Sequence, residues 1–348
     1  MSTLFLLLIL LFGFLITFQI AKASEYVGVL KGEKKNFEQH NRINGFLMIV
    51  FLVLGLVGVW YCNELYRGKI LGESASKHGE EIDNMLYITI AITGVVFIIT
   101  QILLFWFAYK YQYSEKRKAH YFPHDNRLEV VWTVVPAIAL TVLVGFGLFY
   151  WFRITGEAPQ DALQVEVTGK QFGWIFRYPG HDATFGKKYY QNISDKDNNS
   201  LGLIWDDANS HDDVVVNNEM YCVVNRPIKL IIGSRDVIHD VGLVYFRQKM
   251  DAVPGTPTTL WFTPKFTTAE MKKKEGNPDF EYELSCDQMC GKGHYTMRGV
   301  IKVVTNEEFR LWLAKQKSNY SLVMGEQAPA APATPAARPD SAKTTAKN

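Results

Sequence analysis

Apolar residues gather in four blocks in the first half of the chain, and a different pattern follows them. The blocks span residues 4–21, 46–61, 86–109 and 132–152. A helix needs about 20 mainly apolar residues to cross a bilayer. The third and fourth blocks are long enough for this, the first is about long enough, and the second is only just so. The pattern predicts four transmembrane helices.

Basic residues predict the orientation of these helices. Residues 22–45 and 110–131 each carry five Lys or Arg side chains, whereas residues 62–85 carry three against five acidic ones. Basic loops stay in the cytoplasm, so both termini are expected outside. A cleaved signal peptide is the alternative for the first block, because Ala21-Lys-Ala23-Ser has the form of a cleavage site. The loop charges, and the lack of a basic residue before the block, favour an uncleaved helix.

From residue 164 the chain changes to short β-branched and aromatic runs separated by Gly, Pro and Asn. Such runs predict the strands of a Greek-key barrel or sandwich. They cover residues 165–168, 221–224, 228–232, 259–262, 280–284 and 300–304. A capping box at Thr305–Glu308 predicts a helix over residues 307–317. The Ala/Pro-rich residues 324–348 have little to bury and are expected to be disordered.

One stretch near the C-terminal end concentrates metal-binding side chains. Cys286, Cys290, His294 and Met297 lie within twelve residues. Thiolate, imidazole and thioether together favour copper over magnesium or calcium. The best upstream candidate for a further imidazole is His239. The cysteine pair alone would fit a short disulfide, and a lone His or Met is more often structural, but the whole set favours copper.

The net charge and the cysteine content argue against a nucleic-acid-binding protein and against a disulfide-rich scaffold. The formal net charge of +2 gives no basic surplus of the kind that nucleic-acid binding needs. Four cysteines are too few for a disulfide scaffold, and two of them belong to the proposed metal loop.

These motifs resemble subunit II of cytochrome c oxidase over roughly residues 86–305. The resemblance is carried by Cys-x3-Cys-Gly-x2-His-x2-Met, by Asp-Val-Ile-His at 236–239, and by Lys-Met-Asp-Ala-Val-Pro-Gly at 249–255. Residues 129–136 are similar to the family's Glu-x2-Trp-Thr-x2-Pro. The resemblance implies a helix hairpin at 86–153 and a cupredoxin-like, periplasmic β-domain at 157–323. The two N-terminal helices, at 1–62, are then an addition.

By resemblance, the loop holds the binuclear copper centre CuA. Cys286 and Cys290 would bridge both ions, and the remaining ligands would be His239, His294, Met297 and the main-chain carbonyl of Gln288. The family usually has Glu at position 288, whose side chain also reaches a magnesium ion. Gln288 keeps the carbonyl and loses the charge, which makes magnesium doubtful here.

The implied activity is that of the electron-accepting subunit of a cytochrome-c oxidase in the bacterial inner membrane. Electrons would come from cytochrome c, or from a cytochrome c domain of a partner complex. They would pass to haem in subunit I, where oxygen reduction is coupled to proton translocation. Subunits I and III and membrane lipid are the implied partners. The alternatives are the CuA domain of a nitrous oxide reductase and a copper-free quinol oxidase subunit II.

Three further residues receive roles only through the resemblance. Phe172 occupies the place of the family's first tryptophan, where electrons arrive, and Trp174 lies behind it, although packing in the β-domain core is an equal alternative for Trp174. Glu129 would admit protons toward subunit I, whereas its spacing alone indicates an ordinary interfacial charge.

The insertion at 181–218 holds four aspartates: Asp206, Asp207, Asp212 and Asp213. We expect them to steer a basic cytochrome c by long-range attraction. The alternatives are a solvated loop and a calcium site.

Overall fold

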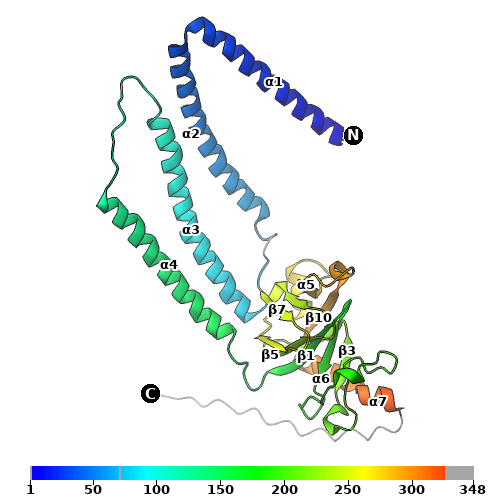
Figure 1. The fold of residues 1–348 in the computed structure, drawn as a ribbon. Helices are drawn as coiled ribbons and strands as arrows, with labels where there is room; N and C mark the ends of the chain where they lie inside the picture. Colours follow the sequence, from blue (N-terminus) through cyan, green and yellow to red (C-terminus); the bar gives the residue numbers. More distant parts are fainter. Residues whose placement is uncertain (1, 70–71, 326–348) are drawn as a thin grey trace. The chain divides into compact units, whose positions relative to one another are not determined.

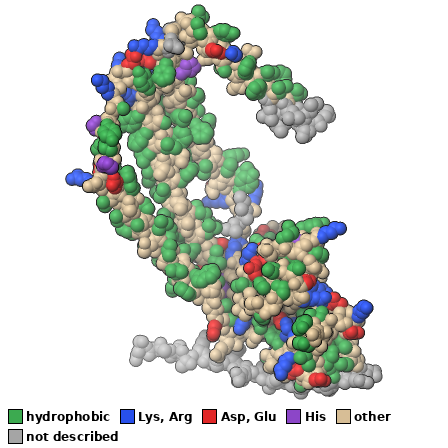
Figure 2. Space-filling model, viewed as in Figure 1, with side chains coloured by type: hydrophobic (Ala, Val, Ile, Leu, Met, Phe, Trp, Pro, Cys, Tyr) green, Lys and Arg blue, Asp and Glu red, His purple; other side chains and the backbone are tan. Residues whose placement is uncertain are grey.

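The N-terminal part of the chain is a series of long helices (Figure 1). We describe residues 2–69 and 72–325 from a computed structural model. The helices are α1 (Ser2–Lys31), α2 (Glu33–Tyr66), α3 (Lys77–Lys110) and α4 (Asn126–Ile154). Among the described residues, α2, α3 and α4 are long and apolar enough to cross a membrane. Hydrophobic side chains are spread along them on the face that Figure 2 shows.

Three of the four predicted spans therefore correspond to helices that could cross a membrane. The first block lies within α1, and its crossing of the membrane stays a prediction. The tail expected to be disordered lies almost entirely outside the described residues. The chain divides into two compact units, and residues 72–86 belong with the part from residue 141 onward.

Two five-stranded sheets make up the β-domain, which confirms the predicted β-fold and adds four strands to the six that the sequence predicts. One sheet has the order β3-β2-β1-β5-β8 and the other β4-β10-β9-β6-β7. β1 pairs with β5 and β10 with β4 in parallel, and the remaining neighbours pair antiparallel. The strands are β1 (Leu163–Lys170), β2 (Gly173–Tyr178), β3 (Val214–Asn217), β4 (Glu219–Val223), β5 (Ile228–Ser234), β6 (His239–Leu243), β7 (Gln248–Ala252), β8 (Thr258–Phe262), β9 (Tyr282–Cys286) and β10 (Arg298–Val304).

The hydrophobic core collects alternate residues of these strands. On β5, Ile228, Leu230 and Ile232 are fully buried, and the residues between them are half-buried. Full burial of such a side chain stabilises the fold by about 1.5–3 kcal/mol. The predicted capping box is confirmed: Thr305 caps α6 (Asn306–Lys315) reciprocally with Glu308. Two shorter helices, α5 (Thr268–Lys274) and α7 (Asn319–Met324), complete the domain.

The segment just before α3 is an integral part of the β-domain. Ser74, Ala75 and Ser76 are buried, and the Ala75 amide donates to the Tyr245 carbonyl at 2.8 Å. The Lys265 amide donates in turn to the Ala75 carbonyl at 2.8 Å. The Ser76 hydroxyl donates to the Phe246 carbonyl at 2.7 Å. Residues 74–76, which precede α3 and α4, thus form hydrogen bonds with backbone groups of residues 245, 246 and 265, which follow these two helices in the sequence.

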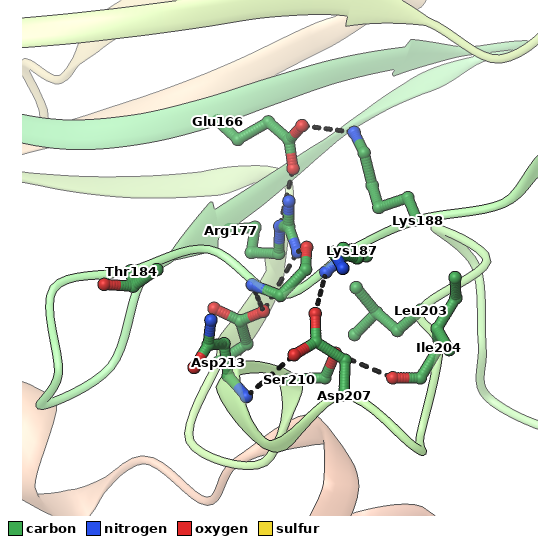
Figure 3. Close-up of polar contacts among 12 residues, drawn as sticks. Glu166, Arg177, Thr184, Lys187, Lys188, Leu203, Ile204, Asp207, Ser210 and Asp213 are labelled. Carbon is green, nitrogen blue, oxygen red and sulfur yellow. Dashed lines mark hydrogen bonds and ion pairs between the residues drawn. The ribbon is translucent and has the colours of Figure 1, made fainter.

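A buried arginine organises the insertion between β2 and β3 (Figure 3). The Arg177 guanidinium is 2.6 Å from a Glu166 carboxylate oxygen and 2.9 Å from one of Asp213. It also donates to the Gly186 carbonyl at 2.8 Å, and Lys188 pairs with the other Glu166 oxygen. These ion pairs connect the insertion to β1 and β2, so it is a packed part of the domain.

The prediction that four aspartates of this insertion steer a basic cytochrome c is wrong for Asp213, and for the other three it stays a prediction. Asp213 is fully buried against Arg177. Asp207 accepts backbone hydrogen bonds from Lys187 and Asn209, and Asp212 accepts them from His181 and Asp182. Asp206 alone among the four is exposed. The other three carboxylates hold the loop in place because they satisfy backbone amides and a buried cation.

Candidate metal centre

The candidate site occupies the loop that joins two paired strands. β9 ends at Cys286 and β10 begins at Arg298, and the two strands are antiparallel neighbours. The Cys286 amide donates to the Met297 carbonyl at 3.2 Å, which closes the loop at its base. Gly291 has a φ of 134°, a conformation that other residues rarely adopt. Antiparallel pairing therefore brings together Cys286 and Met297, the first and last predicted ligands of the loop.

The structure gathers four of the six predicted ligands around the other two, which are the thiols of Cys286 and Cys290. The sulfur of Cys286 lies 3.8 Å from that of Cys290, 3.8 Å from His239 Nδ1 and 3.2 Å from the Gln288 carbonyl oxygen. The sulfur of Cys290 lies 3.7 Å from His294 Nδ1 and 3.8 Å from the Met297 sulfur. Ligand atoms of His239 and the two cysteines all lie within 4.8 Å of one another.

The two thiols are buried and are not joined in a disulfide. Their sulfur separation of 3.8 Å is well above the covalent length of about 2.05 Å. Burial, with the neighbouring Cys286 thiol, raises the pKa of Cys290 to about 11. Thiolates are the form that binds metal, so a metal ion must displace protons as it binds here.

Asp236 fixes the orientation of the His239 ring. One carboxylate oxygen lies 2.8 Å from His239 Nε2, and the other accepts the Gln171 amide at 2.7 Å. The pKa of Asp236 is lowered: burial opposes the charged form, but the hydrogen bonds from Gln171 and His239 outweigh it. An ionised carboxylate at Nε2 leaves Nδ1 facing the thiols. Residue 236 was not among the predicted site residues, although the Asp-x2-His spacing is visible in the sequence.

Close packing holds the imidazole from the other side. A Cβ atom at Gly169 would lie 2.7 Å from the His239 ring, so the backbone of β1 is in contact with the ring. The buried Trp174 ring meets His239 edge-on with ring centres 6.0 Å apart. Phe172 packs on the ligand loop, since a Cβ atom at Gly291 would lie 3.1 Å from its ring.

Glu129 lies in the first turn of α4, and its side chain is exposed. A carboxylate oxygen is 4.0 Å from His124 Nδ1. The structure thus places Glu129 at a helix start, and its predicted role in proton uptake stays a prediction.

Comparisons with known proteins decide the family. The family model of the transmembrane domain of cytochrome c oxidase subunit II matches residues 64–149, and that of its periplasmic domain matches residues 163–304. The alternative cytochrome c oxidase subunit 2 of Bradyrhizobium diazoefficiens is 33% identical over 68% of this chain and 80% of the relative. The chain belongs to the cytochrome c oxidase subunit II family.

A second relative agrees with this assignment. Cytochrome c oxidase subunit 2 of Cereibacter sphaeroides is 26% identical over 72% of this chain and 79% of its own length. The periplasmic domain of subunit II from Bradyrhizobium japonicum has a solved structure, which is 27% identical and covers 45% of this chain and 95% of that one, with a TM-score of 0.31. This cytochrome c oxidase subunit II thus has apolar helices followed by a cupredoxin-like periplasmic domain, as predicted.

Copper is the metal that the family implies, and the donor set of this subunit II fits it. Two thiols, two imidazole nitrogens, a thioether and a carbonyl oxygen surround one small volume. His239, Cys286, Cys290 and Met297 are buried there, away from competing water ligands. Soft sulfur ligands with imidazole select copper, whereas hard cations prefer oxygen.

Proposed function

We propose that this chain is the subunit of a haem-copper oxidase that receives electrons from cytochrome c through a binuclear CuA centre. The observation that carries the proposal is the convergence of six candidate donors at one end of the β-domain, four of them from buried residues. Cys286 and Cys290 would bridge the two ions, and His239, His294, Met297 and the Gln288 carbonyl would complete their coordination.

The copper pair, when bound, supplies a one-electron redox centre. The residues of the chain keep that centre rigid and dry. Burial of His239 and Met297 excludes water, and the Asp236 carboxylate orients the His239 ring. Gln171 donates from its side chain to the Cys290 carbonyl at 2.6 Å, which restrains the loop. A restrained ligand set changes little between redox states, and this suits electron transfer.

Electrons would reach the centre through an apolar surface beside the ligands. Phe172 is 42% exposed and packs on the ligand loop, and Met289 and Tyr295 of that loop are exposed as well. Trp174 is fully buried against His239, so it would act behind Phe172. The donor would be a cytochrome c, or a cytochrome c domain of a partner complex, that docks on this surface.

Electrons would then pass to haem in subunit I, where oxygen is reduced and protons are translocated. The complex would also contain subunit III and lie in the bacterial inner membrane, with the β-domain in the periplasm. Glu129, at the start of α4, would take up protons on the cytoplasmic side. The helices α2, α3 and α4 and the family assignment support this arrangement.

Copper loading of the full-length chain in detergent tests the proposal. We expect a pair of copper ions per chain and the absorption of a delocalised mixed-valence pair. Cys290→Ser should abolish that absorption, because it removes one of the two thiolate ligands of the copper pair. A wild-type chain that binds no copper, as expected of a quinol-oxidase type of subunit II, or only a mononuclear ion, would contradict the proposal.

A further inference from the structure

Three aspartates lie side by side at one edge of the second sheet: Asp251 on β7, Asp240 on β6, and Asp287 directly after β9. The β6–β7 register pairs Asp240 with Asp251. The β6–β9 register pairs Val241 with Cys286, so the next step along places Asp287 beside Asp240. The Asp287 amide donates to the Asp240 carbonyl at 3.4 Å, which confirms this neighbour. Like charges directly opposite each other on neighbouring strands destabilise a sheet, so the row needs a compensating positive charge.

The central carboxylate of the row is buried without a hydrogen bond. The Asp240 side chain is 1% exposed, and neither of its carboxylate oxygens has a hydrogen-bond partner. The Lys249 ammonium is 3.6 Å from Asp240 Oδ2, beyond hydrogen-bonding distance, and that lysine side chain is 60% exposed. Burial of a carboxylate is costly unless a cation and hydrogen bonds satisfy it. Lys249 meets this need only in part.

The two outer carboxylates form an accessible rim around Asp240. Asp251 and Asp287 are both exposed. Gly242 lies two residues after Asp240 on the same face of β6, and a Cβ atom there would collide with the Asp287 carboxylate. The glycine thus leaves room for that carboxylate beside Asp240. The Ser285 hydroxyl donates to Asp287 Oδ1 at 2.8 Å and leaves Oδ2 available.

The row lies on the face of the sheet opposite to the thiols and imidazoles. Side chains alternate along a strand, so Asp240 points away from the face of His239, and Asp287 away from that of Cys286. The ligand atoms that the three aspartates offer are carboxylate oxygens, which bind hard cations such as Mg²⁺, Ca²⁺ and Mn²⁺.

We propose that Asp240, Asp251 and Asp287 form a binding site for one hard divalent cation on the outer face of this sheet. The site does not use residue 288, and it does not depend on the copper proposal. A cation there would neutralise the row, with Asp240 as the buried ligand and Asp251 and Asp287 as the ligands through which the ion enters.

Manganese binding by the full-length chain tests this site. The chain is held in detergent and loaded with copper, and free Mn²⁺ is followed by electron paramagnetic resonance during a titration. We expect one Mn²⁺ per chain, displaced by excess Mg²⁺. Asp251→Asn and Asp287→Asn should each weaken binding by about tenfold, because each removes a charged ligand. Asp279→Asn removes an exposed carboxylate outside the row and should bind as the wild type does.

Thermal unfolding gives a second readout. A cation that binds the folded chain raises the unfolding temperature, so Mn²⁺ should stabilise the wild type and Asp279→Asn but not an Asp251→Asn/Asp287→Asn double variant. The proposal is overturned if the wild type binds no Mn²⁺, or if the double variant binds it equally well. The first result would mean that Asp240 is compensated within the chain, by Lys249 or by a proton shared with Asp251, and the second that Mn²⁺ binds elsewhere.

Discussion

Asp236→Asn should weaken copper binding although residue 236 is not itself a ligand. The Asp236 carboxylate accepts three short hydrogen bonds, from His239 Nε2 at 2.8 Å, from the Val237 amide at 2.7 Å and from the Gln171 amide at 2.7 Å, and a longer one from the Ser234 hydroxyl at 3.5 Å. Asparagine has one acceptor oxygen. Either the His239 side or the Gln171 side must therefore face an NH2 group, which cannot accept.

The expected magnitude follows from this loss. Removal of a partner that orients a metal-bound histidine costs about 10–100-fold in metal affinity, which corresponds to about 1.4–2.7 kcal/mol. The released His239 ring can also take the other tautomer, which turns a protonated nitrogen toward the thiols. We therefore expect a lower copper affinity together with a changed absorption spectrum.

The assay is a competition between the full-length chain and a copper chelator, followed by absorbance and metal analysis. Asp279→Asn serves as the matched control, because it removes the same charge from an exposed site. Equal copper retention by Asp236→Asn, Asp279→Asn and the wild type would refute the orienting role. A loss shared by both variants would show that net charge, rather than the hydrogen bond to His239, controls affinity.

Four more outcomes are expected. Gly169→Ala places a methyl group 2.7 Å from the His239 ring and should lower the copper content of the folded chain, measured by metal analysis. Phe172→Ala should slow stopped-flow reduction by cytochrome c even at saturating donor, and the wild-type rate should depend only weakly on salt because the surface is apolar. Arg177→Met leaves the buried Asp213 carboxylate without a cation and Glu166 with Lys188 alone, and should cost about 3–5 kcal/mol of unfolding free energy in denaturant titrations. Glu129→Gln should slow turnover of the assembled oxidase while its copper content stays unchanged; normal turnover would remove its proposed role.

The ligands of the loop could be predicted because they lie close together in the sequence. Cys286, Cys290, His294 and Met297 lie so close in sequence that any fold that closes the loop brings them together. The positioning contacts could not be predicted in this way. The Asp236 carboxylate reaches the Gln171 amide across 65 residues, and only the pairing of β1 with β5 brings the two together.

Two strands also escaped the sequence pattern, for different reasons. β6 is buried along its whole length and shows no period of two, whereas β7 alternates in burial but has few apolar residues to mark its inner face. The prediction of a surface role for Asp213 failed because it, too, depends on strand pairing. Asp213 has the sequence context of a surface loop, but β2 pairs with β3, which brings it to Arg177 36 residues away. Burial of a charge depends on such a partner, and sequence spacing does not reveal it.

The docking of residues 74–76 into the β-domain has a consequence for biogenesis. The polypeptide enters this domain, leaves it for α3 and α4, and returns at β1. The carbonyls of Tyr245 and Phe246 and the amide of Lys265 receive their partners from chain made before both helices. Insertion of the two helices into the bilayer thus becomes a step in the maturation of the periplasmic domain. The strands of the C-terminal half, once translocated, then fold against residues 74–76, which are already on the periplasmic side.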